Sequence, residues 1–162
     1  MKDWGRRPIE VRNLFNPAFC GLILYRALVA FQESDPRGMP FSMSLLILPL
    51  ALQRHSREVI QRGNRNYLLR VMADHPELQV GFAQRCTEML PFTLEALGVL
   101  HSVGTLSVSV EGRLTTKPEG VKKTVSGTDE SKQAQRVATF IGKEFASIGR
   151  SSTVYTTMGI RP

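Results

Sequence analysis

The sequence predicts a mainly α-helical protein with one small β-hairpin, which is an α+β fold. Apolar residues recur every three or four positions over most of its 162 residues, the spacing of one helix face. The period changes to two near residues 106–110, where Leu, Val and Val alternate with two serines. Turn residues separate these stretches, so each stretch is expected to form its own element.

Composition favours one globular domain spanning residues 1–162. Hydrophobic residues make up 42% and charged residues 22%, and these ordinary values exclude collagen-like, disulfide-stabilised and fully disordered chains. A chain of this length holds a core without cross-links. The formal net charge of +7 is spread along the chain without a basic tail. It indicates a solvated surface, and it also suits a subunit whose partners are acidic or bound to a polyanion.

The cysteines and the lengths of the apolar runs indicate the cellular compartment of the protein. Cys20 and Cys86 lie far apart in apolar runs, so we expect packed thiols and no zinc site. No apolar run approaches the roughly 20 residues that span a bilayer. The first seven residues are not followed by the apolar segment of a signal peptide. We therefore expect a cytoplasmic protein with reduced thiols and no membrane contact.

The first helix is predicted over residues 17–33. Asn16 can cap the free backbone N–H groups, and Pro17 suits the first helical position because a proline loses no hydrogen bond there. Apolar residues at spacings of three and four run from Phe19 to Phe31, which indicates a largely buried helix of about four turns. The turn residues at 34–38 end it.

A helical core is predicted over residues 43–103. Residues 43–52 are apolar on every face, which is typical of a buried helix, and Pro49 is expected to kink it. Asn64 or Asn66 can cap a short helix that runs through Val71. A further helix begins at 74–76, and Pro91 is expected to interrupt it before a second apolar helix continues to 103. Its inward stripe consists of Leu78, Phe82, Cys86, Met89 and Leu90.

A hairpin wing is predicted over residues 105–116. Leu106, Val108 and Val110 alternate with serines, and Glu111–Gly112 form a tight turn. Residues 115–127 then read as an exposed loop. Helices followed directly by a hairpin have the element order of a winged helix-turn-helix, so the expected architecture is a winged-helix-like helical domain.

The last helix is predicted over residues 129–149. Acidic residues follow Thr128 at the positive end of the helix dipole, and Gly149 is a natural C-cap. Beyond it, Thr-Val-Tyr-Thr at 153–156 is a strand candidate that could pair with the hairpin.

Catalysis is not expected. His55, His75 and His101 lack the spacing of a metal site, and no nucleophile, phosphate-loop or paired-carboxylate motif is present. We therefore expect no enzymatic activity, no catalytic residue, no metal, no cofactor and no small-molecule substrate.

Two groups of basic residues are candidate contacts for DNA phosphates or for an acidic partner. For the group that begins at Arg54, the alternative is a solvated helix rim. The predicted helix at 92–101, directly before the hairpin, has no Arg, Lys, Asn or Gln, the residues that read base edges most often. Any DNA contact is therefore expected to be to phosphates and nonspecific. The groups are Arg54, Arg57, Arg62, Arg65 and Arg70 in one stretch, and Arg113, Lys117, Lys122 and Lys123 around the wing.

Several short motifs resemble one family. They are Arg-Pro-Ile-Glu at 7–10, Leu-Phe-Asn-Pro-Ala-Phe-Cys-Gly at 14–21, Gly-Met-Pro-Phe at 38–41, Leu-Pro-Leu at 48–50 and the closing Gly-Ile-Arg-Pro. In order and spacing they resemble the middle component of three-component ABC ATPase (ABC-3C) systems, the group that includes Lamassu-type anti-phage defence. One departure follows Leu-Pro-Leu, where Gln53 to Arg57 stand in place of an expected His and Lys near a Thr-Arg pair.

The resemblance implies a non-enzymatic adaptor subunit. Such a protein bridges an SMC-like or Rad50-like ABC ATPase with a coiled coil and an effector, often a nuclease. It helps to restrain that effector until foreign DNA is sensed. The family is also similar to the winged-helix partners of SMC complexes, which agrees with the predicted element order.

Motif residues are the candidate partner interface. Arg161 near the C-terminal end is expected to form a buried or interfacial ion pair, because the terminal Gly-Ile-Arg-Pro serves no core purpose. The other candidates are expected to be framework with some interface role, and the alternative is framework alone, in which Asn16 only caps and Pro49 only kinks. These candidates are Phe15, Asn16, Pro17, Phe19, Leu48, Pro49 and Leu50.

A different function remains open. The same element order fits a free-standing winged-helix DNA-binding regulator, which would be a dimer with a specific operator. An enzyme would require a pocket with perturbed titrating groups. The helix that lacks base-reading residues favours the adaptor over the regulator.

Overall fold

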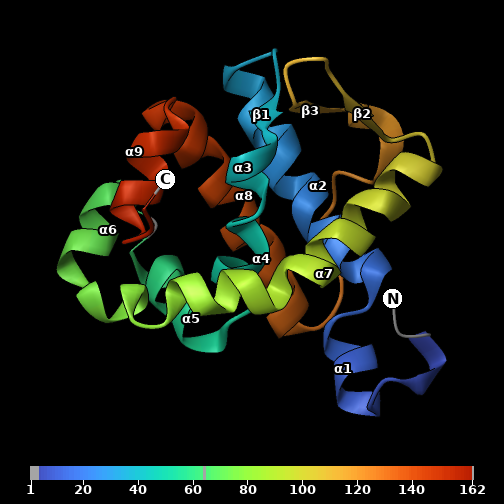
Figure 1. The fold of residues 1–162 in the computed structure, drawn as a ribbon, viewed down its shortest axis with the longest axis horizontal. Helices are drawn as coiled ribbons and strands as arrows, with labels where there is room; N and C mark the ends of the chain where they lie inside the picture. The colour runs from blue at the N-terminus through green and yellow to red at the C-terminus, as the bar shows by residue number, and fades with distance from the viewer. Residues whose placement is uncertain (1–3, 64, 162) are drawn as a thin grey trace.

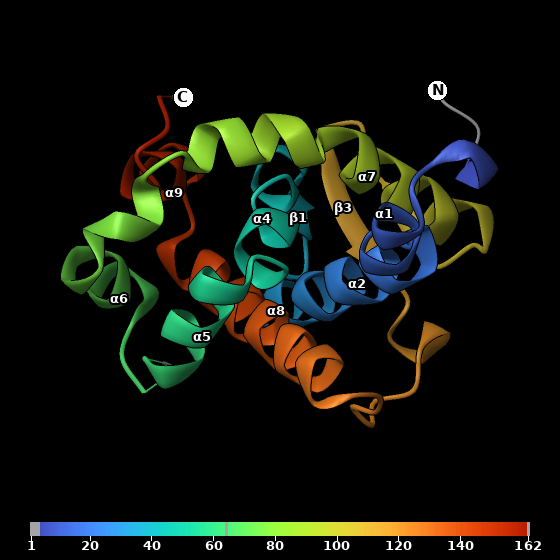
Figure 2. The ribbon, with the colours of Figure 1, turned by 90° about the horizontal axis from the view of Figure 1, so that it is seen from below.

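The computed structural model describes residues 4–63 and 65–161, and it is mostly helical with one small antiparallel sheet (Figure 1). The α+β class is therefore confirmed. Three long helices form the frame: α2 (Pro17–Ser34), α7 (Phe82–Ser102) and α8 (Asp129–Ile148). Helices α2 and α4 (Ile47–Ala51) lie between α7 on one side and α8 on the other (Figure 2).

Helices α2 and α8 begin at the predicted residues and end within one residue of the predicted positions. The Asn16 side-chain oxygen accepts a hydrogen bond from the Ala18 N–H at 2.8 Å, and Thr128 Oγ1 accepts one from the Ser131 N–H at 3.2 Å. Gly149 ends α8 in the left-handed conformation with φ 77°. Gly142 permits α2 and α8 to touch, because a side chain there would collide with the carbonyl of Ala27.

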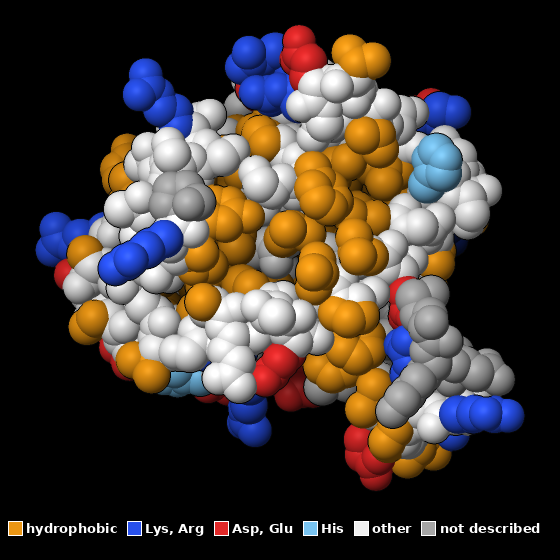
Figure 3. All heavy atoms as spheres, in the orientation of Figure 1, with side chains coloured by type: hydrophobic (Ala, Val, Ile, Leu, Met, Phe, Trp, Pro, Cys, Tyr) orange, Lys and Arg blue, Asp and Glu red, His pale blue; other side chains and the backbone are white. Residues whose placement is uncertain are grey.

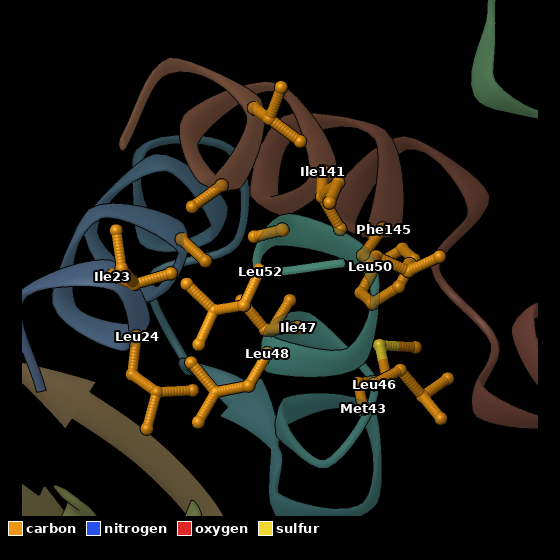
Figure 4. Close-up of a cluster of buried hydrophobic side chains, with 14 of the residues drawn as sticks. Ile23, Leu24, Met43, Leu46, Ile47, Leu48, Leu50, Leu52, Ile141 and Phe145 are labelled. Atoms are coloured by element: carbon orange, nitrogen blue, oxygen red, sulfur yellow. The ribbon is translucent and has the colours of Figure 1, made fainter. Parts of the chain in front are cut away.

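The apolar stretch 43–52 is buried as predicted, but it is two short helices instead of one. Helix α3 covers Phe41–Ser44 and α4 covers Ile47–Ala51. The break includes Leu45, which lies four residues before Pro49. In a continuous helix, the ring of Pro49 would collide with the carbonyl group of Leu45. The side chains of α4 fill the centre of the core between α2 and α8 (Figure 4).

Two short helices, α5 (Arg54–Arg62) and α6 (Leu68–Asp74), and the 3-10 helix η2 (Pro76–Gln79) connect α4 to α7. The predicted Asn cap of α6 is wrong for Asn66, because Tyr67 is the N-cap residue and Asn64 lies outside the described residues. The first N–H group of α6, that of Leu68, instead donates to Glu144 of α8 at 2.7 Å.

Helix α7 does not stop at Pro91, so the predicted interruption is wrong. The helix runs from Phe82 to Ser102 with Pro91 on its exposed side. The carbonyl of Thr87, which loses its helical partner, can there be hydrated at small cost. Leu90 is exposed as well, so it does not belong to the inward stripe.

The hairpin is confirmed, and the structure adds a third strand. Strand β2 (Leu106–Val108) pairs with β3 (Arg113–Thr116), with Leu106 opposite Thr116. Strand β1 (Met39–Pro40) pairs with the other edge of β3, so the sheet order is β1-β3-β2. Gly38, at φ 90°, allows this pairing because a side chain would meet the backbone of Leu114. The following loop contains one 3-10 helix, η3 (Pro118–Gly120).

The C-terminal strand candidate is a helix, α9 (Ser151–Thr157). Val154 and Met158, four residues apart, are both fully buried, and the Tyr155 hydroxyl donates to the carbonyl of Ser42 at 2.7 Å. These contacts with the core outweigh the strand preference of Thr153, Val154 and Thr156, because strand propensity depends strongly on context.

Residues 4–15 form an N-terminal arm that projects from the body of the protein (Figure 1). The arm contains the 3-10 helix η1 (Trp4–Arg6) and helix α1 (Ile9–Leu14). Within the described residues, the stretch Ile9–Ser34 alone is long and apolar enough to cross a membrane. Most of its α2 part is buried inside the protein, and a core helix passes the same test.

Candidate interaction surfaces

The outer face of α7 carries an apolar strip that no other element covers. Leu90, Leu94 and Gly98 follow one another at intervals of four residues, with Pro91 beside them, and all four are exposed. We call these four residues the α7 face. A broad hydrophobic area, with charged groups mainly at its edges, covers the region where α7 and α3 lie (Figure 3). Such a patch is typical of a protein-binding surface.

The N-terminal arm is clamped to the other flank of α7. The Arg7 guanidinium donates to both carboxylate oxygens of Glu95, at 2.9 and 2.5 Å. Phe15 stacks on Phe92 with 4.5 Å between ring centroids, and the Arg7 guanidinium lies over the same Phe92 ring. The structure thus brings the motif at residues 7–10 and the motif at residues 14–21 together against helix α7.

We expect Arg7→Ala to release the arm without unfolding the body. The bidentate ion pair with Glu95 holds the arm to α7, whereas Phe15, at the end of the arm, is the one described arm residue that packs against the core. Hydrogen–deuterium exchange should rise over residues 8–15, with little change in α2 or α8. The control is Arg6→Ala, an exposed arginine next to it. Equal exchange in both variants would show that the clamp does not hold the arm.

The other motif residues separate into two places. Phe15, Pro17 and Phe19 are half-buried where the arm meets α2, and Asn16 is an exposed cap. Leu48, Pro49 and Leu50 are buried in the core, where they cannot meet a partner. An interface role therefore remains a proposal for the first group, while the Leu-Pro-Leu residues support the fold.

Arg57 is nearly buried, in contrast to the other arginines of its group. Its side chain is 7% exposed, and its guanidinium donates to the carbonyl of Leu52 at 3.1 Å and to Gln133 at 2.8 Å. Glu130 of α8 lies 3.6 Å away. The preceding Gln53, at the departure from the family motif, caps α5 by accepting from the Ser56 N–H at 2.6 Å.

Two hollows of about 420 Å³ each adjoin Arg57 at the base of the arm. Both are lined by Leu52, Arg57 and Glu130. The first also contains Phe15 and side chains of α5 and α7, and the second contains Phe19 and the first turn of α8. The 14–21 motif, which contains Phe15 and Phe19, therefore lines both hollows together with the stretch that follows Leu-Pro-Leu.

The remaining arginines of the first group are exposed on α5, α6 and the turn between them. Arg54 and Arg62 both face Glu58, at 2.9 and 3.8 Å, and Arg54 lowers the pKa of this carboxyl group. Arg70 pairs with Asp74 at 3.1 Å. Solvent weakens such exposed pairs, so these arginines stay available to a polyanion. Arg65 is exposed too, and it forms no ion pair with another described residue.

The basic residues around the wing also differ in exposure: one is half-buried and three are exposed. Arg113 is half-buried, donates to the carbonyl of Gly38 at 2.6 Å and pairs with Asp35 at 3.5 Å, so it holds β1 to the hairpin. Lys117, Lys122 and Lys123 are exposed around the loop after β3. Near the C-terminal end, Arg161 is exposed and forms no ion pair within the described residues. Only an interfacial pair remains to be proposed for it.

The described residues contain no group of three or more His, Cys, Asp or Glu side chains that could hold a metal. Burial raises the pKa of the Cys20 thiol to about 12 and that of Cys86 to about 11, so neither thiol is prepared to act as a nucleophile at neutral pH. His55 and His75 both approach the exposed carboxylate of Glu77, at 3.7 and 3.1 Å.

Sequence reasoning missed Glu95, Phe92, Arg85 and Glu130. Arg7 and Glu95 are 88 positions apart, and no spacing rule joins residues so distant. The one available clue is that Arg7 belongs to the first family motif.

A family model described as ABC-three component (ABC-3C) system Middle Component 3 matches residues 4–162. No curated protein and no solved structure matches the chain. The match extends from the arm to the end of the chain and so includes the α7 face and both hollows.

Proposed function

This chain belongs to the Middle Component 3 family of ABC-three component systems, and we propose that it acts there as a non-enzymatic adaptor. Membership implies partners within the same system. In the proposed role, the chain bridges an SMC-like or Rad50-like ABC ATPase and an effector, often a nuclease, in a Lamassu-type anti-phage system of the cytoplasm. It restrains the effector until the ATPase senses foreign DNA.

Chain topology supports a winged-helix-like domain. Helix α2, strand β1 and helices α3 and α4 precede α7, and α7 leads directly into β2 and β3. The sheet order β1-β3-β2 places the early strand against the hairpin, as in a winged helix. In this interpretation α5 and α6 are an insertion before α7, which takes the position of the recognition helix.

The observation that carries the adaptor proposal is the chemistry of the α7 face. A recognition helix that reads DNA presents Arg, Lys, Asn or Gln to the bases. Here the exposed strip instead contains Leu90, Pro91, Leu94 and Gly98. Burying leucine side chains against another protein is favourable, whereas they make no contact with phosphates. The α7 face is therefore the proposed binding surface for another component.

The test is the double variant Leu90→Asp/Leu94→Asp. We expect its affinity for the other two components, produced together and immobilised for biolayer interferometry, to fall about 100-fold or more, since central apolar anchors dominate binding. The control is Leu69→Asp on α6, because Leu69 is 44% exposed and Leu94 is 47% exposed. Circular dichroism establishes that both variants are folded.

Three outcomes separate the possibilities. A selective loss in the double variant supports docking through α7. Unchanged binding of the folded double variant would reject this surface. Failure of the wild-type chain to bind either component, together with a shift of one particular DNA duplex at physiological salt, would favour the free-standing winged-helix regulator.

A further inference from the structure

We propose that the hollow between Arg54 and Arg57 receives an acidic side chain, flanked by apolar residues, from another component of the system. The inference rests on the proposed adaptor function and adds a second contact, away from the α7 face. The hollow has a volume of about 420 Å³. Its lining includes three arginines, Arg54, Arg57 and Arg85, and the carboxylates of Glu88 and Glu130.

A buried cation stands at one wall of this hollow. Arg57 is held by the carbonyl oxygens of Ala51 and Leu52 and by Gln133, all of which are uncharged. A guanidinium that is nearly excluded from water requires a negative partner, because the desolvation of an unpaired charge is costly. The nearest carboxylate is that of Glu130, at 3.6 Å.

Glu130 is a weak partner for such a cation. Its side chain is 76% exposed, and its oxygen approaches Arg57 without reaching hydrogen-bond distance. The Arg7–Glu95 pair of the same chain shows the contrast, since both side chains are 11% exposed and the pair is bidentate. Glu130 can therefore swing into solvent, and a carboxylate supplied by a partner can take its place beside Arg57.

The other residues that line the hollow indicate what kind of segment supplies the incoming carboxylate. Arg85 donates only to the carbonyls of Leu78 and Val80, so no described carboxylate compensates its charge. Arg54 adds a third cation at the rim. The apolar surface of Phe15, Leu52 and Met89 suits apolar neighbours of the incoming acid.

The same lining argues against DNA as the ligand. A hollow of this volume accepts one or two side chains, whereas a duplex presents a convex row of phosphates. Glu88 and Glu130 also stand in the lining, where they repel a polyanion. A single carboxylate that displaces Glu130 leaves the local charge unchanged. An acidic-apolar peptide segment of a protein is therefore the favoured occupant.

The experiment measures binding of the full chain to the other two components, again by biolayer interferometry. Glu130→Gln is expected to tighten binding roughly threefold, because it removes the competing carboxylate. Arg54→Glu is expected to weaken binding about tenfold, because it places a like charge at the rim. Removing any surface carboxylate can favour an acidic partner, so the decisive result is a gain in Glu130→Gln that its charge-matched control does not show.

The chain offers matched controls for both variants. Asp129→Asn neutralises the neighbouring first-turn acid of α8, which does not line the hollow. Arg62→Glu reverses a charge on the same helix as Arg54, with the same partner Glu58 and nearly equal exposure, 78% against 79%. Both controls should bind like the wild type.

The outcomes are distinct from those of the α7 test. If the wild-type chain binds but Glu130→Gln and Arg54→Glu behave like their controls, the acidic-site inference is wrong and the adaptor function stands. If a 20-base-pair duplex binds the chain and Arg54→Glu weakens that binding more than Arg62→Glu does, the hollow is a phosphate site and the inference is also wrong. If the wild-type chain binds neither component, both proposals fail.

Discussion

Gly142→Ala is expected to lower the free energy of unfolding by about 3 kcal/mol, because the added methyl group overpacks a helix contact. The new Cβ would lie 2.8 Å from the carbonyl carbon of Ala27, closer than van der Waals contact allows. The obstacle is the backbone of α2, so no side-chain rotation relieves it. Helices α2 and α8 must separate, and Ile141 and Phe145 lose packing with them. Urea denaturation followed by circular dichroism measures the effect.

Gly98→Ala is the matched control for this variant. Gly98 is also inside a long helix, but an added Cβ there would have no atom within 4 Å. Alanine favours a helix by about 1 kcal/mol relative to glycine, so Gly98→Ala should stabilise the protein. Destabilisation of equal size in both variants would contradict the close packing of α2 against α8.

Leu48→Ala is expected to lower the free energy of unfolding by about 3 kcal/mol, within the range for buried leucines. Leu48 is fully buried at the centre of the core, close to Leu24 of α2 (Figure 4). Its removal leaves a cavity lined by apolar side chains that cannot all move inward. The same denaturation experiment measures the loss, with Leu48→Met as the control of nearly equal volume.

The Leu48→Ala variant also decides between two roles of the Leu-Pro-Leu motif. If the motif only supports the fold, the folded variant should bind the other components with unchanged affinity at a temperature well below its melting transition. Reduced affinity of the folded variant, with no loss of stability, would show that Leu48 reaches the partner. Burial of all three motif residues favours the first result.

The two proposed interaction surfaces differ in their chemistry. The α7 face is apolar and open, whereas the hollow beside Arg57 combines cations with apolar side chains. The arm lies next to both, since Arg7 and Phe15 contact α7 and Phe15 also lines the hollow. A partner that meets both surfaces would therefore also contact the arm, and the Arg7→Ala variant can report whether the arm position matters.

The elements that the sequence predicted well are those fixed by neighbouring residues. Asn16, Thr128 and Gly149 bound helices through contacts with residues two to four positions away. The alternation at 106–108 and the turn before Arg113 determine the hairpin in the same local way. The uniformly apolar stretch 43–52 had to be buried wherever the rest of the chain placed it, because exposing it to water is unfavourable.

The elements that the sequence predicted wrongly depend on distant partners. Residues 151–157 are helical because Val154 and Met158 fit the core and Tyr155 reaches Ser42, 113 positions away. Helix α7 continues through Pro91 because that proline faces solvent. Strand β1 exists because β3 has a free edge beside Met39. None of these conditions is visible in a local window of residues.

The sequence by itself determined the class of the fold, the bounds of its capped helices, its hairpin and the family to which it belongs. Only the tertiary structure decided which of the clustered arginines meet solvent: it buries Arg57 against Gln133, 76 positions away, and leaves Arg54 exposed three residues earlier. The physical reason is that caps and periodicity act over one helical turn, whereas burial and charge pairing depend on elements that meet only after the chain has folded.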